Sequence, residues 1–365
     1  MAINVGIVGL PNVGKSTLFN ALTKAKIGAE NFPFCTIDPN TGIVPMPDPR
    51  LDKLAEIVSP QRVVHNTMEF VDIAGLVAGA SKGEGLGNKF LAHIRETDAI
   101  IHVARCFEDE NVTHVDGSLD APRDVETVDT ELGLADIETL ERRSSRARKA
   151  SKAGGKEARD EAAFFEALLA HVSSGAPAHT FAVPDGQRNA FRDCHLNTAK
   201  PVLFVANVDE TALREGNAHT AALETHAEEA GAKVVLLCGK VEAELSELDD
   251  ESRREFLADL GLEEPGLHRL IRAAYELLGL ITFFTTTGKK EVKAWTIRRG
   301  TRAPQAAGVI HTDFERTFIR AEVTSVDGFV AAGGEAGARS GGTLSIEGKD
   351  YEIRDGDVVH FRVGG

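Results

Sequence analysis

The sequence is poor in cysteine and has no long apolar run. None of its cysteines belongs to a C-x-x-C pair, and the four are far apart, at Cys35, Cys106, Cys194 and Cys238. This pattern argues against a disulfide framework or a zinc site and is typical of a reduced, cytoplasmic protein. No apolar stretch approaches the ~18 residues of a membrane-spanning helix, so we expect no membrane partner. The opening MAINVGIVGL runs directly into a glycine loop, which predicts a first strand and not a signal peptide.

Net positive charge is also lacking. The formal net charge of −15 argues against a protein that coats nucleic acid or recognises DNA sequence, although local basic patches stay possible. Internal repeats and low-complexity tracts are absent. The apolar share of 42% and the charged share of 27% are typical of a soluble globular protein, and 365 residues suit two or three domains.

Short apolar runs alternate with helical patterns, which predicts an α/β fold with a parallel sheet covered by helices. The predicted strands are residues 3–8, 67–72, 99–104, 201–206 and 233–238. Helical spacing of apolar residues marks 15–25, 88–97 and 266–279.

Two further segments differ in composition from this alternating part. Between residues 130 and 192, Ala, Glu, Arg and Lys with periodic leucines predict two helices broken at Gly154-Gly155, an inserted antiparallel hairpin. From Leu280 onward, short β-rich runs, helical turns and glycine-rich loops indicate a small α+β module. We therefore predict a P-loop domain over 1–129 and 200–279, a hairpin over 130–199, and a C-terminal domain over 280–365.

The strongest motif is the glycine loop at residues 9–16, GLPNVGKS, which fits G-x-x-x-x-G-K-[ST] between a predicted strand and a predicted helix. That context disfavours the alternative of a chance glycine-rich turn. Backbone N–H groups of such a loop surround phosphates, the lysine reaches the β- and γ-phosphates, and the Ser hydroxyl binds Mg²⁺. Lys15 is thus a catalytic candidate and Ser16 a metal ligand, and the predicted nucleotide contacts are Asn12, Val13, Gly14, Lys15, Ser16 and Thr17.

Two other segments complete a predicted triphosphate site. Asp72-Ile73-Ala74-Gly75 ends a predicted strand, so Asp72 can hold Mg²⁺ through water, and Gly75 can offer its N–H to the γ-phosphate. The irregular loop before it contains Thr36, whose hydroxyl would bind Mg²⁺ and sense the γ-phosphate. A D-x-x-G tetrad or a loop threonine alone usually marks only a turn.

Leu76 follows Gly75, where Ras-type enzymes place a glutamine that orients the attacking water. A leucine side chain has no donor or acceptor, so water is positioned from elsewhere or hydrolysis is very slow. His114, in a polar loop after the strand at 99–104, is the catalytic candidate, and an exposed loop histidine is the alternative.

Guanine-specific P-loop proteins use Asn-Lys-x-Asp to read the base, but the corresponding stretch here is Asn207-Val208-Asp209-Glu210. Val208 lacks the lysine stem that covers guanine, and Glu210 is one methylene too long, so guanine selectivity should be lost. Asn207 can still bond a purine edge, and the backbone at Cys238 and Gly239 would form the rim of the base pocket. ATP is therefore the expected substrate, with Mg²⁺ as cofactor.

These motifs resemble the YchF, or Obg-like, ATPase family over essentially the whole chain. The resemblance is carried by the glycine loop through LFNALT, by NFPFCTIDPNTG, FVDIAGLVAGASKGEGLGN and the Asn-x-x-Glu variant, and by IHTDFERTFIRAEV and DGDVVHFR. It implies a G domain, an inserted helical hairpin and a C-terminal TGS domain of ubiquitin-like β-grasp shape. It also implies a preference for ATP, ribosome binding (50S or 70S), a hydrophobic residue such as Leu76 in place of the glutamine, and a histidine where His114 lies.

Two basic stretches are candidates for contact with ribosomal RNA. Residues 142–156 of the hairpin carry a charge of +7, and residues 289–302 of the C-terminal domain carry +5. The alternative is a solvated helix face that balances charge elsewhere. We predict a slow ATPase that acts on the ribosome in translation or stress regulation. A GTP-driven Obg-type switch and a nucleotide-dependent binding module without useful turnover are the alternatives.

Overall fold

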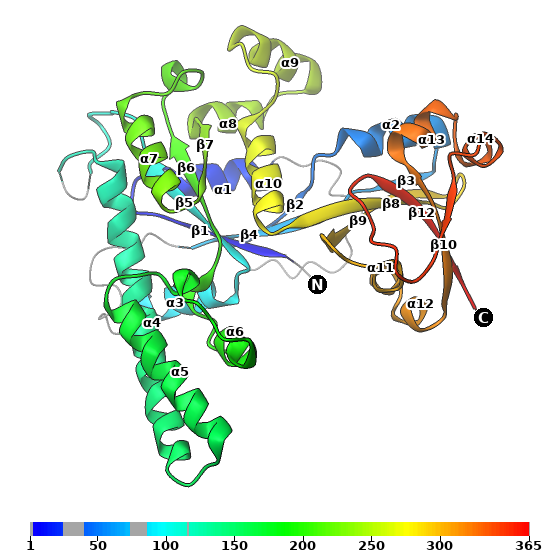
Figure 1. Ribbon diagram of the computed structural model, residues 1–365. Helices are drawn as coiled ribbons and strands as arrows, with labels where there is room; N and C mark the ends of the chain where they lie inside the picture. The colour runs from blue at the N-terminus through cyan, green and yellow to red at the C-terminus, as the bar shows by residue number, and fades with distance from the viewer. Residues whose placement is uncertain (1–2, 25–39, 74–85, 115–116, 365) are drawn as a thin grey trace. The chain divides into compact units, whose positions relative to one another are not determined.

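The computed structural model describes residues 3–24, 40–73, 86–114 and 117–364 (Figure 1). The chain divides into two compact units, one of Met1–Val44 with Glu69–Leu270, the other of Pro45–Met68 with Ile271–Gly365. Within the described residues, no helix is both long enough and apolar enough to cross a membrane.

The first unit is built on a six-stranded sheet with the strand order β2-β4-β1-β5-β6-β7. β1 pairs in parallel with β4 and β5, β5 with β6, and β6 with β7, so the five predicted strands and their parallel arrangement are confirmed. Every residue of β5 is buried, which explains why the strand is almost entirely apolar, with His102 and the final Arg105 as its polar residues. The strand bounds are β1 Asn4–Val8, β2 Thr41–Pro45, β4 Thr67–Asp72, β5 Ala99–Arg105, β6 Val202–Asn207 and β7 Lys233–Leu237.

Helices connect these strands at positions close to the predicted ones. The glycine loop leads into α1, and the last predicted helix of this part of the chain is α10. Outside the hairpin, the helices associated with this unit are α1 Lys15–Lys24, α3 Leu86–Glu96, α7 Ala218–Glu229, α8 Gly239–Leu245, α9 Asp250–Asp259 and α10 Gly266–Leu277, of which α10 continues into the second unit.

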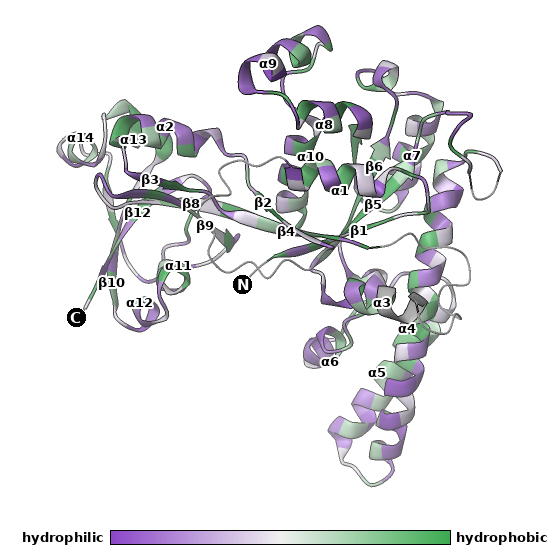
Figure 2. Ribbon diagram, turned by 180° about the vertical axis from the view of Figure 1, so that it is seen from behind, coloured by the Kyte–Doolittle hydropathy of each residue, from purple (hydrophilic) through white to green (hydrophobic). Residues whose placement is uncertain are grey.

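The inserted hairpin consists of α4 Ala121–Ser151 and α5 Lys156–Ser173, which lie side by side and alternate hydrophilic and hydrophobic residues (Figure 2). The predicted break at Gly154-Gly155 is confirmed. α4 begins nine residues before the predicted start, because Asp120 caps it and Pro122 fits its first turn. The start of α4 is buried in the core of the first unit, and only its later part forms the hairpin.

After the hairpin, the chain returns to the sheet through α6 Arg188–Arg192 and three short 3₁₀ helices, Ala178–Thr180, Asp185–Gln187 and Asn197–Ala199. The fully buried carboxylate of Asp136 on α4 accepts hydrogen bonds from both the backbone and the side chains of Asn197 and Thr198, at 2.8 to 3.1 Å. These bonds fix the middle of α4 to the segment that enters β6.

The second unit contains a mixed six-stranded sheet with the order β11-β10-β12-β8-β9-β3. β8 and β9 form an antiparallel hairpin, whereas β12 runs parallel to β8 and antiparallel to β10. The strand bounds are β3 Arg62–Val64, β8 Leu280–Thr286, β9 Glu291–Arg298, β10 Phe318–Ser325, β11 Ser345–Glu347 and β12 Asp357–Val363. The helices are α2 Pro49–Val58, α11 Ala303–Ile310, α12 Thr312–Arg316, α13 Val326–Ala331 and α14 Glu335–Ser340.

Residues 45–68 differ from the predicted division, which placed them in the N-terminal domain. β3 pairs in parallel with β9, and Leu51 and Leu54 of α2 are fully buried in one cluster with Phe284. The amide of Asn66 also donates to the hydroxyl of Tyr275 at 3.1 Å. Burial of these apolar side chains favours this pairing, and it joins segments more than 200 residues apart that no local pattern connects.

Candidate nucleotide-binding site

The glycine loop curves through three residues with positive φ, which are Gly9 at 151°, Asn12 at 64° and Gly14 at 97°. A Cβ atom on Gly9 would lie 2.4 Å from the carbonyl oxygen of Val103. A Cβ on Gly14 would lie 2.2 Å from Nδ2 of Asn207. The loop therefore needs glycine at both positions, for backbone conformation and for space.

Lys15 is buried at the start of α1, with 6% of the residue exposed. Its Nζ donates to the carbonyl oxygen of Leu10 at 2.7 Å. Burial lowers the pKa of Lys15 to about 8, and the charge of Asp72 partly opposes this shift. An ammonium group that is costly to keep charged in this position favours an anionic ligand such as a phosphate.

Ser16 and Asp72 meet beside this lysine, where the Ser16 hydroxyl donates to Oδ2 of Asp72 at 3.4 Å. Oδ1 of Asp72 is buried and has no hydrogen-bond partner among the described residues. Burial raises the pKa of the Asp72 carboxyl, while Lys15 and Ser16 oppose the rise. A buried carboxylate oxygen without a partner is costly, and a cation would satisfy it.

Asn207 at the end of β6 bridges two loops of the site. Its Nδ2 donates to the carbonyl oxygen of Val13 at 2.8 Å, and its Oδ1 accepts from the backbone N–H of Gly239 at 2.9 Å. The sequence predicts that this amide can bond a purine edge. In the structure its nitrogen and its oxygen both bond to the protein backbone, and the residue holds the glycine loop to the loop after β7.

Val208 and Asp209, which follow Asn207 in the base-reading stretch, also contact other parts of the protein. Val208 is 2% exposed and packs in the core cluster that contains Leu213 and Val241. Oδ1 of Asp209 accepts from the backbone N–H of Ala212 at 3.0 Å and so caps the short helix at Glu210–Ala212. Glu210 itself is exposed. The side chain of Val208 and one oxygen of Asp209 are thus both engaged within the protein.

His114 is only 10% exposed, and its Nε2 lies 2.7 Å from Oδ2 of Asp124, whose side chain is 3% exposed. Its loop is tied to the glycine loop, because Nδ2 of Asn12 donates to the carbonyl oxygen of Thr113 at 3.2 Å. The buried Arg105 donates to backbone carbonyls at 107, 109 and 112 of the same loop. The alternative of an exposed loop histidine is therefore wrong, because two neighbouring elements hold the residue in place.

Of the remaining predicted residues, three lie outside the described part of the chain and Cys238 lies within it. Thr36, Gly75 and Leu76 lie outside the described residues. Cys238 is 3% exposed directly before α8, and burial raises the pKa of its thiol, so its side chain is part of the packed core. The described residues of the predicted site other than Glu210 come from the glycine loop, from the ends of β4, β6 and β7, and from the loop after β5.

The structural partners of these residues were missed by the sequence analysis. Arg105 and Asp124 carry no motif, and Asp124 is an ordinary acidic residue in the first turn of a helix. Nζ of Lys240, in the first turn of α8, lies 3.5 Å from Oδ2 of Asp109 in the loop after β5. Only the topology, which brings β5 beside β6 and β6 beside β7, places these residues together.

Comparisons with known proteins identify the family of this chain. Residues 280–364 match the family model YchF-GTPase_C, described as a protein of unknown function, and residues 4–136 match a model described as 50S ribosome-binding GTPase. The chain is 56% identical over 362 residues to the "Ribosome-binding ATPase YchF" of Haemophilus ducreyi and 51% identical over 364 residues to that of Bacillus subtilis, with 99% of each chain covered. The chain belongs to the YchF family.

A solved YchF structure supports the fold over both units. The Schizosaccharomyces pombe protein, described as a YchF GTPase, superposes with a TM-score of 0.87 at 36% identity, covering 99% of this chain and 97% of that one. The names within the YchF family thus differ on the nucleotide, since the bacterial relatives are called ATPases. The choice of base has to be argued from the residues of the site.

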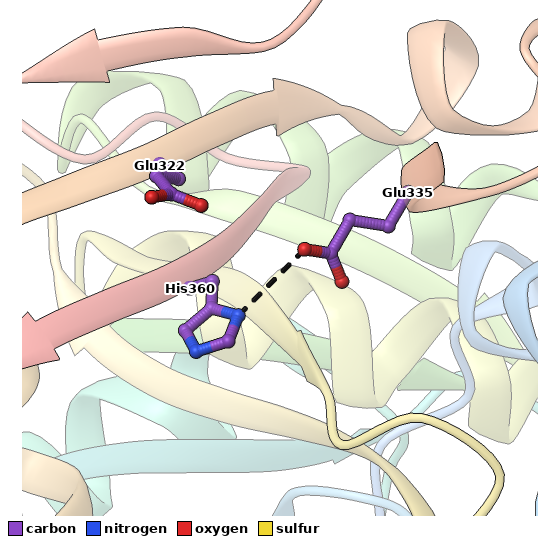
Figure 3. Close-up of side chains that lie close together, drawn as sticks. All are labelled: Glu322, Glu335 and His360. Atoms are coloured by element: carbon purple, nitrogen blue, oxygen red, sulfur yellow. Dashed lines mark ion pairs between the residues drawn. The ribbon is translucent and has the colours of Figure 1, made fainter. Parts of the chain in front are cut away.

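A second cluster of titratable side chains lies in the other unit of this YchF chain, where Glu322, Glu335 and His360 approach one another (Figure 3). Their ligand atoms lie within 4.8 Å of one another. Glu322 is already paired with the guanidinium groups of Arg362, Arg339 and Arg320. Arg362 and then Arg339 lower the pKa of its carboxyl to about 2. Three cations around one carboxylate leave little attraction for a metal ion, so this cluster is an ion-pair network.

Proposed function

We propose that this YchF chain binds ATP with Mg²⁺ in the glycine-loop site, hydrolyses it slowly, and associates with ribosomes in the cytoplasm. The observation that carries the proposal is the meeting of the buried Lys15 ammonium with the Ser16–Asp72 pair inside a loop that requires Gly9 and Gly14. This arrangement supplies a cation for the phosphates and oxygen ligands for a metal in one place.

The residues at the metal position fit Mg²⁺. The ion prefers oxygen ligands, and the Ser16 hydroxyl lies beside a carboxylate whose Oδ1 has no hydrogen-bond partner among the described residues. Ser16 and Asp72 would hold the ion, and Thr36 is proposed as a further ligand. When bound, Mg²⁺ neutralises charge on the β- and γ-phosphates.

The proposed preference for ATP follows from how the stretch at 207–210 is used. Guanine recognition needs a carboxylate that accepts two hydrogen bonds from the base. One carboxylate oxygen of Asp209 accepts the hydrogen bond of a helix cap, and the amide of Asn207 bonds two backbone groups. The side chain of Glu210 is one methylene longer than the aspartate that reads guanine. The backbone at Cys238 and Gly239 would then form the rim of the base pocket, and the N–H of Gly239 already donates to Asn207.

The proposed hydrolysis is slow because Leu76 cannot orient water. Lys15 and the N–H of Gly75 would stabilise the γ-phosphate, and His114 is proposed to act on the attacking water. His114 is supported by its place in a loop that bonds the glycine loop through Asn12. A role in translation or stress regulation is part of this proposal.

The structure shows that acidic side chains offset part of the basic charge that supports the proposed contact with ribosomal RNA. The sum of +7 ignores the acidic residues that face it, since Arg142 pairs with Glu138 and Arg148 pairs with Glu166. Over residues 137–173 the hairpin has eight Lys and Arg against six Asp and Glu, a net +2. Its tip at 146–156 keeps five Lys and Arg and no acidic residue, so we propose the tip as the contact.

Most of the basic residues of the second stretch, 289–302, lie at opposite ends of β9 and do not form one cluster. Lys289 and Lys290 lie in the turn before the strand, whereas Arg298 and Arg299 lie at its far end. Between them, Nζ of Lys293 lies 3.6 Å from the ring centre of Trp295. The TGS domain is therefore proposed as a secondary contact, through separate small patches and not one continuous surface.

A competition experiment tests the nucleotide proposal. The purified protein is titrated with a labelled ATP analogue and Mg²⁺, and unlabelled ATP or GTP is added as competitor. We expect ATP to displace the probe at least as well as GTP. Displacement by GTP at a concentration ten times lower than ATP would instead support the Obg-type switch.

A further inference from the structure

The contact between His114 and Asp124 has features of an orienting pair. The 2.7 Å separation of Nε2 and Oδ2 is typical of a charge-assisted or strong hydrogen bond. The Asp124 side chain is 3% exposed and that of His114 is 10% exposed, so water competes little for the bond. The inference below rests on the proposed role of His114 in hydrolysis.

Asp124 has little freedom to move, because α4 is anchored around it. Ala121 and Val125 on either side are fully buried in the core of the first unit. The guanidinium of Arg123 lies 3.4 Å from Oδ1, the second oxygen of the carboxylate. The carboxylate is thus a fixed point to which the imidazole is attached.

The backbone of the His114 loop is held independently of Asp124. Arg105, which is 5% exposed, donates to the carbonyl oxygens of Phe107, Asp109 and Val112 at 3.0, 3.2 and 2.8 Å. Asn12 of the glycine loop donates to the carbonyl oxygen of Thr113. Because other residues fix the loop backbone, the contact with Asp124 determines the orientation of the His114 imidazole ring.

We infer that Asp124 is a positioning residue for His114. Its carboxylate accepts the Nε2 hydrogen, which keeps that hydrogen on Nε2 and holds the ring in one orientation beside the glycine loop. A base that a third group orients is the usual arrangement where a histidine acts on a nucleophile.

Asp124 lies on the same helix that forms the hairpin, so this pair connects the nucleotide site to the hairpin. α4 continues from Ala121 to Ser151 as one helix of 31 residues, and its later part forms the hairpin. Asp136 fixes the middle of the same helix to the segment at Asn197 and Thr198. The helix that orients His114 is therefore also the helix proposed to meet the ribosome.

A double-mutant cycle tests the inference. We expect Asp124→Ala to lower kcat for ATP about 10- to 100-fold with little change in ATP affinity, because the ring loses its orientation. In a His114→Ala background the same substitution should change kcat by less than about twofold, since its effect passes through His114. A loss of equal size in both backgrounds overturns the inference.

Asp120→Ala provides the matched control. It removes the cap of α4 without removing the partner of His114, so we expect a Tm lowered by a few degrees and an unchanged kcat. If Asp120→Ala lowers kcat as much as Asp124→Ala does, the effect comes from a disturbed helix start and the inference is wrong.

A spectroscopic measurement does not depend on turnover. With ¹⁵N-labelled histidine, the ring signal of His114, assigned from its loss in His114→Ala, should show protonation at Nε2 and should change in Asp124→Ala. An unchanged His114 signal in Asp124→Ala contradicts the contact. Wild-type protein that does not hydrolyse ATP would contradict the proposed function itself and the inference with it. Active wild-type protein with additive losses contradicts the inference alone.

Discussion

Nδ2 of Asn207 donates a hydrogen bond to the carbonyl oxygen of Val13 across 2.8 Å, and it occupies the space that a side chain on Gly14 would need. The end of β6 and the glycine loop are therefore fitted to each other. Because Oδ1 of the same amide accepts from the N–H of Gly239, one side chain fixes the distance between the phosphate loop and the proposed base rim.

The first prediction concerns this bridge. Asn207→Asp replaces the donor with an oxygen that faces the Val13 carbonyl. We expect the free energy of unfolding to fall by about 1–3 kcal/mol and the affinities for ATP and GTP to fall by the same factor. Calorimetric titration with each nucleotide checks this. A loss confined to one nucleotide would mean that Asn207 contacts the base.

The second prediction follows from the buried Lys15. Burial lowers its pKa from 10.5 to about 8, so between these values the unfolded chain binds more protons than the folded chain. Stability should therefore rise with pH across this window. The Lys15 contribution between about pH 8 and about pH 10 is roughly 2 kcal/mol. Urea unfolding of wild type and Lys15→Met isolates it, since the variant should lack this rise. Parallel curves would contradict a buried, depressed lysine.

The third prediction concerns the guanine-reading stretch. Val208→Lys with Glu210→Asp rebuilds Asn-Lys-x-Asp in sequence, but Val208 lies in the core with 2% exposure. We expect a loss of about 2–4 kcal/mol of unfolding free energy, because an ammonium replaces a packed side chain. Glu210→Asp alone is the matched control and should stay as stable as wild type. Tight GTP binding by a stable double variant would contradict this and would show that a side chain at position 208 can reach a bound base.

The fourth prediction concerns the hairpin tip. Lys149→Glu with Lys152→Glu should weaken cosedimentation with ribosomes and flatten its salt dependence, because fewer phosphate contacts release counterions. Arg188→Glu with Arg254→Glu changes the net charge equally at exposed positions away from the tip and should bind like wild type. Equal weakening in both variants would point to net charge and not to the tip.

The centre of the nucleotide site could be predicted because its strongest motif is contiguous in the sequence. The glycine loop contains its own signals, since glycine spacing, a lysine and the flanking strand and helix all lie within about twenty residues. Asp72 was found because it ends an apolar strand. The five parallel strands could be predicted because burial on both faces favours short, nearly all-apolar runs, as in β5.

The rest depends on pairing across long stretches of chain. Nothing local to β3 indicates that it pairs with β9, and nothing local to Asp124 indicates that it faces His114. The charge of the hairpin was overestimated for the same reason, because Glu166 on α5 faces Arg148 on α4. Contacts between elements, and not the composition of one segment, decide these features.

The most direct measurement is single-turnover hydrolysis of ATP and of GTP, with Mg²⁺, by the purified protein with and without ribosomes. The account predicts slow release of phosphate from ATP, faster release when ribosomes are present, and no advantage for GTP. Lys15→Ala should remove the activity in every condition, because the lysine charge lies on the transferring phosphate. Turnover that prefers GTP, or that persists in Lys15→Ala, would contradict the account.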